Sequence, residues 1–327
     1  MDYFVDEKND GRTVLDIVKH ELSISSGHLK HLKFIEGGIL VNREHATVRK
    51  VLRAGDILTL ATEDDFCDGH IEPAELPLDI AYEDADCVVP SKSADMPTHP
   101  SHGHYGDTVA NALAYKYSAE GIPFVFRPVN RLDRNTSGLL LIAKNRIAAG
   151  ILSDAMRRGE IKKVYIAILS GRLPENEGYI ETYMRRTAES IIVRENCKEG
   201  EGGDYALTKY KVLMNTDSHT LVAASPITGR THQLRVHFAG KGAPILGDDM
   251  YGESSSLIDR HGLHSALLSF PRACDGERVT AVSRLPLDME GAAEKIFDGF
   301  GTADIYSECE TFLSEIQSIS AEKVYNG

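Results

Sequence analysis

The segment Asn130–Gly138 holds the residues best suited to chemistry, because its carboxylate, Asp133, lies between two arginines, Arg131 and Arg134. Two neighbouring guanidinium groups favour the ionised form of a carboxylate. An apolar segment follows directly and would hold the turn rigidly, so Asp133 could act at a cleft as a nucleophile or a base. A turn aspartate that bonds nearby backbone amides explains the same residues, and on composition alone it is the commoner case.

A second candidate group surrounds Gly229, where a turn leads into a predicted helix over residues 231–241. Thr231 can cap that helix, which would place Arg230 at its N-terminus. Backbone amides and a guanidinium at a helix N-terminus can together bind an anion. An ordinary cap with a solvated arginine is again the commoner arrangement when the spacing is taken alone.

The sequence gives little support for a metal site or for a nucleotide cofactor. His99, His102 and His104 lie close together, but no acidic residue or cysteine completes a known metal-ligand spacing. The five cysteines are scattered and form no Cys-x-x-Cys pair, which argues against structural zinc and a disulfide framework. Dinucleotide-binding, Walker A, nucleophile-elbow and zincin motifs are also missing from the sequence. We therefore expect no metal and no cofactor.

Charge is distributed unevenly along the 327 residues. The net charge of −13 at first argues against a nucleic-acid partner. Residues 62–86, however, hold ten acidic residues and no lysine or arginine, and residues 288–327 hold nine acidic residues and two lysines. Between Arg127 and Lys163, nine basic residues face three acidic ones. Such a local field can attract a phosphate backbone, although cations that merely solvate helix surfaces explain it equally well.

Apolar periodicity places both candidate groups in an α+β domain. Residues 138–143 and 164–169 are predicted to be buried strands, and the second of them carries Tyr165, which on pattern alone is an ordinary core residue. Asp107 and Asn145 can each cap a helix, and residues 291–327 indicate one or two amphipathic helices. We expect a mixed, mostly antiparallel central sheet with flanking helices.

Residues 12–61 form a separate small α/β unit in this pattern. An apolar stripe and a second helix over residues 25–34 precede two short strands, at residues 39–42 and 57–60. Lys30 and Lys33 fall on the polar side of the second helix, and Arg43 follows the first strand. The remaining chain then divides into an acidic linker, a catalytic domain and an acidic C-terminal extension, over residues 62–76, 77–290 and 291–327.

Five segments, in order, resemble the RluA-type pseudouridine synthases. Residues 130–138 resemble the catalytic loop of that family. The others are residues 77–84 with Lys92 and His99-Pro100, residues 161–165, residues 229–237, and residues 242–248 with Tyr251-Gly252 and Leu263-His264. The chain departs from the family pattern at Asn130, where the family has histidine, at Ser265, where it has alanine, and around Lys92. Residues 12–61 resemble the small alpha-L RNA-binding module.

The resemblance implies a role for each matching residue. Asp133 would be the catalytic carboxylate, and Tyr165 an active-site tyrosine that stacks on the target base and assists proton removal. Arg230 would be the basic residue that pairs with Asp133, and Arg131 would fill the gap left by the flipped base. Further RNA-binding candidates are Arg134, Lys30, Lys33 and Arg43.

The implied function is an RNA uridine isomerase that needs neither metal nor cofactor, and the N-terminal module favours ribosomal RNA as its substrate. A transfer RNA pseudouridine synthase and a non-catalytic RNA-binding or ribosome-assembly factor on the same fold are the alternatives. No apolar run reaches the length of a membrane span, and the acidic start differs from a secretory signal. We expect a cytoplasmic monomer with no membrane partner.

Overall fold

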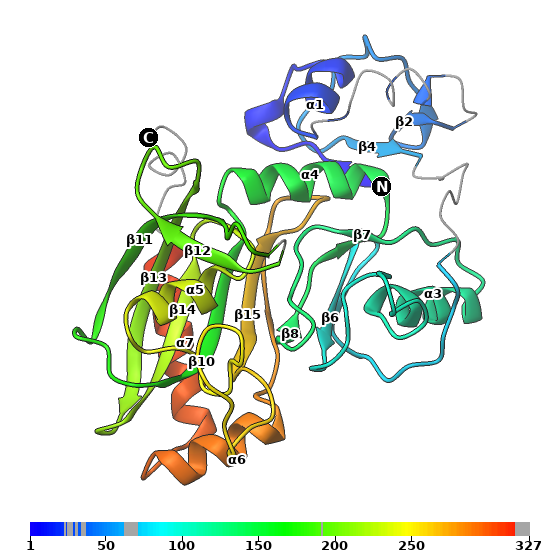
Figure 1. The fold of residues 1–327 in the computed structure, drawn as a ribbon. Coiled ribbons are helices and arrows are strands. Elements are labelled where there is room, and N and C mark those ends of the chain that lie inside the picture. Colours follow the sequence, from blue (N-terminus) through cyan, green and yellow to red (C-terminus); the bar gives the residue numbers. More distant parts are fainter. Residues whose placement is uncertain are drawn as a thin grey trace.

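The computed structural model describes residues 1–22, 24, 29, 32–33, 37–61, 71–190 and 192–317. Its strands form a four-stranded and a twelve-stranded sheet (Figure 1). This is the mixed, mostly antiparallel α+β architecture that the sequence predicts: every pairing in the large sheet is antiparallel except the one between β15 (Leu263–Pro271) and β8 (Ser137–Leu139). No helix in the described part of the chain is long and apolar enough to cross a membrane.

The small sheet belongs to the N-terminal module and has the strand order β1-β4-β2-β3. Its strands are β1 (Asp2–Phe4), β2 (Ile39–Val41), β3 (Glu44–His45) and β4 (Ile57–Leu60). Helix α1 (Val14–His20) begins at a capping box, in which the side chain of Thr13 accepts from the backbone of Asp16 and the Asp16 carboxylate accepts from the backbone of Thr13. The predicted second helix, over residues 25–34, lies mostly outside the described residues, as does Lys30.

The large sheet carries the catalytic region, and its order is β12-β11-β13-β14-β10-β15-β8-β6-β9-β7, with β16 beside β15 and β5 beside β6. The strands not yet bounded are β5 (Asp79–Glu83), β6 (Cys87–Lys92), β7 (Arg127–Pro128), β9 (Ile142–Ala143), β10 (Lys162–Ser170), β11 (Glu177–Arg186), β12 (Arg194–Cys197), β13 (Asp204–Asn215), β14 (His219–Pro226) and β16 (Arg278–Val282). The helices are α3 (Val109–Ala119), α4 (Arg146–Arg157), α5 (Gln233–Gly240), α6 (Leu287–Ile296) and α7 (Thr302–Gln317).

Strand β10 is the centre of the large sheet and is buried on both faces. Its side chains alternate: Val164 and Ile166 point into a hydrophobic core that α6 and α7 complete, whereas Tyr165 and Ala167 point into a second core that includes residues of α5. Figure 1 shows α7 behind the strands and α5 in front of them. The acidic C-terminal extension therefore contributes apolar side chains to the core, since α6 and α7 pack on one face of the central strands of this sheet.

Three sequence predictions need correction in their local detail. The predicted strand over residues 138–143 is divided into β8 and β9, because Pro90 of the neighbouring β6 has no N–H to continue the ladder and only its carbonyl bonds Leu140 N. Helix α3 is capped by Thr108 rather than Asp107. Helix α5 begins after His232, whose backbone is left-handed with φ of 58°, and not at a Thr231 cap.

The N-terminal module is packed on the catalytic region as well as tethered to it. Its buried side chains and those of α4 belong to one hydrophobic cluster, and Figure 1 shows α4 lying between the two sheets. Part of the predicted acidic linker is also held: Glu72 O accepts from Asn111 Nδ2 at 2.7 Å, and Ala74 N donates to Asn111 O at 3.2 Å. Deleting the module would therefore expose apolar surface on α4.

Gly138 lets β8 approach β15 at the only parallel pairing in the described part of the large sheet. Its φ is +106°, and a Cβ on it would overlap the backbone carbonyl of Ser265. Because neither backbone can move without breaking the pairing, only glycine fits here. Gly138 thereby fixes the distance between the loop that carries Asp133 and the strand beside Tyr165.

We predict that Gly138→Ala destabilises the protein by about 3 kcal/mol or more, through backbone overlap and positive φ together. The control is Gly291→Ala, within helix α6, where a Cβ meets nothing within 4 Å and φ is not positive. That change should stabilise by roughly 0.5–1 kcal/mol through helix propensity. Urea unfolding of the two variants measures both effects, and equal stabilities would contradict the steric account.

Candidate active site

The loop with Asp133 is held by its backbone. Thr98 Oγ1 donates to Leu132 O at 3.1 Å and lies 3.4 Å from Leu132 N, and Thr136 N donates to Asp133 O at 3.1 Å. Asn130 Oδ1 accepts from Leu141 N at 2.7 Å, which fastens the start of the loop to the strand after it. The carboxylate of Asp133 is therefore presented by a fixed turn rather than by a free loop.

A buried lysine supports the other side of this loop. Lys92 is 1% exposed, and its Nζ donates to Arg134 O and to Ser93 O, both at 2.8 Å. Burial, followed by the charge of Arg260, lowers the pKa of Lys92 to about 7, although the charge of Asp133 opposes this shift. Lys92 thus ties the catalytic loop to the end of β6.

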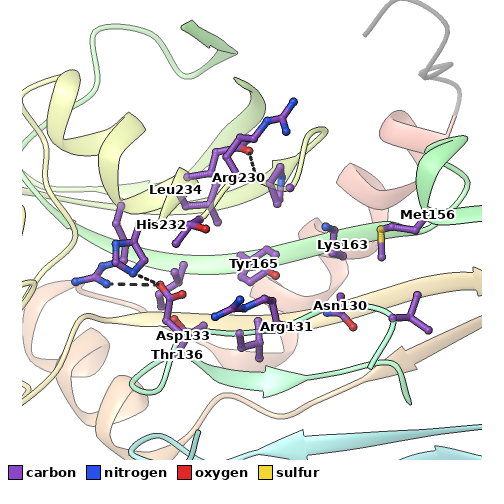
Figure 2. A pocket seen from close by; sticks show the side chains of 18 residues that line it. Asn130, Arg131, Asp133, Thr136, Met156, Lys163, Tyr165, Arg230, His232 and Leu234 are labelled. Atoms are coloured by element: carbon purple, nitrogen blue, oxygen red, sulfur yellow. Dashed lines mark hydrogen bonds and ion pairs between the residues drawn. The ribbon is translucent and has the colours of Figure 1, made fainter. Parts of the chain in front are cut away.

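Asp133 faces two basic side chains from α5 and its N-terminus. Its Oδ2 lies 3.5 Å from Arg235 Nη1 and 3.8 Å from His232 Nε2, and its side chain is 26% exposed (Figure 2). Arg235 is in turn anchored by Asp248, with Nε–Oδ2 and Nη2–Oδ1 both at 2.7 Å. Asp133 therefore meets a cation whose direction is already fixed.

The Arg235–Asp248 pair is shielded from water. The Asp248 side chain is fully buried, and the Arg235 side chain is 6% exposed. Burial alone would raise the pKa of Asp248, but the hydrogen bonds and charge of Arg235 outweigh it and hold the pKa below its ordinary value. The carboxylate also accepts from the backbone N–H groups of Met250 and Tyr251, at 3.1 and 3.2 Å, so its lone pairs are satisfied.

His232 reaches Asp133 because its backbone is left-handed. Its Nδ1 lies 2.8 Å from Tyr251 Oη, and that hydroxyl also accepts from Arg194 N at 2.9 Å. Burial lowers the pKa of His232, while the charge of Asp133 opposes that change. A neutral imidazole at neutral pH follows from the lowered pKa, so Arg235 is the permanent cation beside Asp133.

Tyr165 lies opposite this carboxylate on β10, and its register partner across the sheet is Ser265 on β15. It is 7% exposed, and burial raises the pKa of its hydroxyl, with the charge of Asp133 raising it further. The phenol therefore stays protonated at neutral pH. Its ring is available as a flat surface within the site, and its hydroxyl as a proton donor.

A cavity of about 240 Å³ joins these groups. Asp133 and Tyr165 line it together with Arg131, Arg230, His232 and Arg235 (Figure 2). A negatively charged oxygen beside an aromatic ring, within a ring of cations, suits a polyanionic substrate whose base can enter the cavity. The carboxylate is then positioned for nucleophilic or base chemistry.

Comparisons with known proteins show the family to which this chain belongs. The family model described as RNA pseudouridylate synthase matches residues 86–240. An uncharacterised RNA pseudouridine synthase of Bacillus subtilis (strain 168), YjbO, is 37% identical over 269 residues, covering 82% of this chain and 94% of its own. The chain belongs to the RNA pseudouridine synthase family. It is an enzyme, the predicted RNA uridine isomerase of the RluA type.

Two further relatives are informative. A ribosomal large subunit pseudouridine synthase D of Zymomonas mobilis is 34% identical over 234 residues, which cover 68% of this chain and 73% of the relative. The structure of human RNA pseudouridylate synthase domain containing 1 superposes with a TM-score of 0.53 at 30% identity, covering 67% of this chain and 86% of that one. Both support the same family and the same fold.

Within this pseudouridine synthase, the predicted site residues divide into two groups. Asp133, Tyr165, Arg131 and Arg230 all line the one cavity. Arg134 does not line it, and its guanidinium instead lies 2.5 Å from the carboxylate of Asp95. The side chains of Lys33 and Arg43 are exposed on the N-terminal module, and Lys30 lies outside the described residues.

The predicted pairing of Arg230 with Asp133 needs correction. Arg230 Nε donates to Tyr205 O at 2.9 Å, and Nη1 lies 4.0 Å from Asp204, whereas Arg235 occupies the place beside Asp133. The cause is helix phase: α5 starts at Gln233, so Arg230 lies in the turn before the helix and Arg235 on its buried face. Neither Asp248 nor His232 was predicted from the sequence as a site residue. The one signal available in the sequence is that a carboxylate, Asp248, follows Arg235 by thirteen residues; its burial against that arginine is seen only in the structure.

We predict that Arg235→Met destabilises the synthase by about 3–5 kcal/mol, because it leaves the carboxylate of Asp248 buried and unpaired. Arg230→Met should cost less than about 1 kcal/mol, since that guanidinium is partly exposed. The double variant Arg235→Met/Asp248→Leu should recover part of the loss. Urea unfolding of the three proteins gives these values, and a similar cost for both single variants would contradict the assignment.

Proposed function

We propose that this RNA pseudouridine synthase modifies uridines of ribosomal RNA, with Asp133 as its catalytic carboxylate. The observation that carries the catalytic part is the cluster itself: Asp133 lies between Arg235 and His232 at one end of a cavity that also contains the ring of Tyr165. The ribosomal substrate is supported by the relatives named ribosomal large subunit pseudouridine synthase D, at 34–36% identity.

The geometry suits each step of the isomerisation. The bond between N1 of the base and C1′ of the ribose breaks, the base turns, and C5 joins C1′; a proton leaves C5 and N1 gains one. Asp133 acts either as a nucleophile at the ribose or the uracil, in a bond that breaks again before the product leaves, or as a base that removes a ribose proton and returns it. The turned base stacks on Tyr165, whose ring faces the same cavity as the carboxylate. Redistribution of bonds within one molecule requires no electron donor or acceptor.

The target uridine must leave its stack before it can enter the cavity, which costs a few kcal/mol. Arg131 lines the cavity, yet its side chain is exposed, so it can reach the space that the flipped base leaves in the RNA. The arginines at the cavity edge attract the phosphates on either side. The residues that hold the flipped base and those that bind the RNA phosphates are thus neighbours around one cavity.

The deciding experiment maps pseudouridines in total RNA from cells with and without the protein. We expect one or a few ribosomal sites to disappear without it and to return with the wild-type chain or with Asp217→Asn, a control whose carboxylate is fully exposed on a hairpin. Asp133→Asn should fold normally but return less than a tenth of the modification. Sites confined to transfer RNA would refute the ribosomal substrate, and no changed site would favour a non-catalytic RNA-binding factor.

The N-terminal module is proposed to add affinity for structured RNA. Its exposed cations include Lys33, Arg43, Arg49, Lys50 and Arg53. Arg43 lies at the turn between β2 and β3, with a left-handed backbone of φ 71°, so its side chain projects from the tip of a hairpin. Contacts of this kind would bind phosphates and carry little base specificity.

We predict that Arg43→Asn lowers the slope of log affinity against log salt by about one unit, because one phosphate contact is lost. Asparagine tolerates the left-handed backbone, so the turn itself should persist. Lys295→Asn, on the exposed side of α6, removes the same charge at a remote place and should leave the slope unchanged. Filter binding over a range of KCl concentrations measures both slopes, and identical slopes would exclude Arg43 from the interface.

A further inference from the structure

Lys163 is a buried cation that the site described so far does not use. It is 9% exposed on β10, two residues before Tyr165, and lines the same cavity (Figure 2). Within the described residues, its ammonium group has no hydrogen-bond or ion-pair partner. The nitrogen is open to the cavity, since in the described part of the chain the fully buried polar side-chain atoms without a partner are Asn130 Nδ2 and Ser265 Oγ. A charge with so little contact with water is nevertheless costly unless something pairs with it, so this residue requires an explanation.

The contrast with Lys92 shows what is missing. Lys92 is even more deeply buried, but it donates to two backbone carbonyls. For Lys163, burial alone lowers the pKa to about 8, with no contribution from any nearby charge. The ammonium group therefore has three donors that the protein leaves unsatisfied, and it is still largely protonated at neutral pH. An anion that arrives with the substrate would satisfy them.

A second cavity explains where that anion would lie. It has a volume of about 220 Å³ and is lined by residues that include Arg157, Lys162, Ser225 and Thr228. The two cavities share a wall made of Met156, Lys163, Pro226, Gly229 and Arg230. Lys163 thus borders both the cavity that contains Asp133 and the one beside it.

The charged groups around this wall are almost all cations. Besides Lys163 itself, they are Arg131, Asp133, Arg230 and Arg235 in the first cavity, and Arg157, Lys162 and Arg230 in the second. Asp133 is the single carboxylate among these lining residues, and Arg235 lies beside it. The second cavity has no acidic residue in its described lining, which includes, besides Lys163, three cations and the hydroxyl groups of Ser225 and Thr228 beside apolar side chains. The charged side chains that line it therefore favour an anion such as a phosphate.

We propose that Lys163 binds the phosphodiester that joins the target uridine to its neighbouring nucleotide, and that this neighbour occupies the second cavity. The proposal rests on the RNA substrate of the proposed function but not on which RNA it is. Lys163 is then a positioning residue: it holds the backbone at the wall between the cavities, so that the flipped base lies beside Tyr165. Binding would replace an unpaired buried cation with an ion pair.

The first test measures affinity for a synthetic RNA fragment that carries the mapped uridine. Lys163→Met should bind it about tenfold or more weakly at low salt. The slope of log affinity against log salt should also fall by about 0.7–1. Lys163→Arg should restore the slope, and Lys295→Met should match the wild type. A wild-type slope for Lys163→Met would overturn the proposal.

Stability separates this role from a structural one. Because the free protein bears the cost of an unpaired buried charge, Lys163→Met should unfold at the same temperature as the wild type or higher, while binding RNA more weakly. A lysine that serves the fold would show the opposite pattern, with lower stability. A destabilised Lys163→Met variant that binds with the wild-type salt slope would therefore count against the proposal.

The second test uses the wild-type protein, and variants serve only to assign the lysine resonances. In the wild-type protein, nuclear magnetic resonance of the lysine side chains should show Lys163 titrating near pH 8. Saturation with hexauridylate should raise that pKa by one unit or more, which makes binding strongest below pH 8 and weaker as pH rises above it. An unchanged titration at saturation would overturn the proposal. A synthase whose mapped uridine lies in transfer RNA would refute only the ribosomal substrate, since the first test runs on whichever fragment is mapped and the second on hexauridylate.

Discussion

The active site depends on one buried ion pair. Arg235 and Asp248 are held by two hydrogen bonds of 2.7 Å in the interior, and the remaining Nη1 of Arg235 points at Asp133. An isolated arginine beside a partly exposed carboxylate would exchange partners with water, whereas this one is fixed before any substrate arrives. The desolvation cost of burying two charges is met by the two hydrogen bonds and the backbone donors on Asp248.

The rest of the catalytic region brings Asp133 to that pair. The loop comes from the strand end at β8, and α5 comes from the far side of the meander, so the two are more than ninety residues apart in sequence. The parallel pairing of β8 and β15 joins the loop to the centre of the sheet, and Gly138 sets its distance. A rigid sheet that is buried on both faces is a suitable frame, because its strands cannot shift without opening two hydrophobic cores.

The sequence predicted the architecture and the identity of the main groups, but not how charges pair. Strand β10 and the Asn145 cap of α4 follow from local periodicity and capping chemistry, which need only neighbouring residues. The partner of Asp133 depends on the phase of α5 to within one residue. That phase is set by the left-handed backbone of His232, and no local propensity of a histidine predicts it. The predicted strand over residues 138–143 is divided because Pro90, in the neighbouring strand β6, interrupts the hydrogen-bond ladder between them. The apolar pattern of residues 138–143 carries no sign of this.

The two buried lysines of the site show how a single fold can use the same side chain in opposite ways. Lys92 donates to Arg134 O in the catalytic loop and to Ser93 O beside it, so its hydrogen bonds contribute to holding Asp133 in place whether or not RNA is bound. Lys163 is also buried but borders two cavities and has no acceptor among the described residues, and its burial lowers its pKa to about 8. A protein that needed Lys163 only for packing would be more stable with methionine of similar length there. We therefore interpret this charge as part of the substrate's binding energy: Lys163 has no partner among the described residues of the free enzyme, and a phosphate of the RNA becomes its partner on binding.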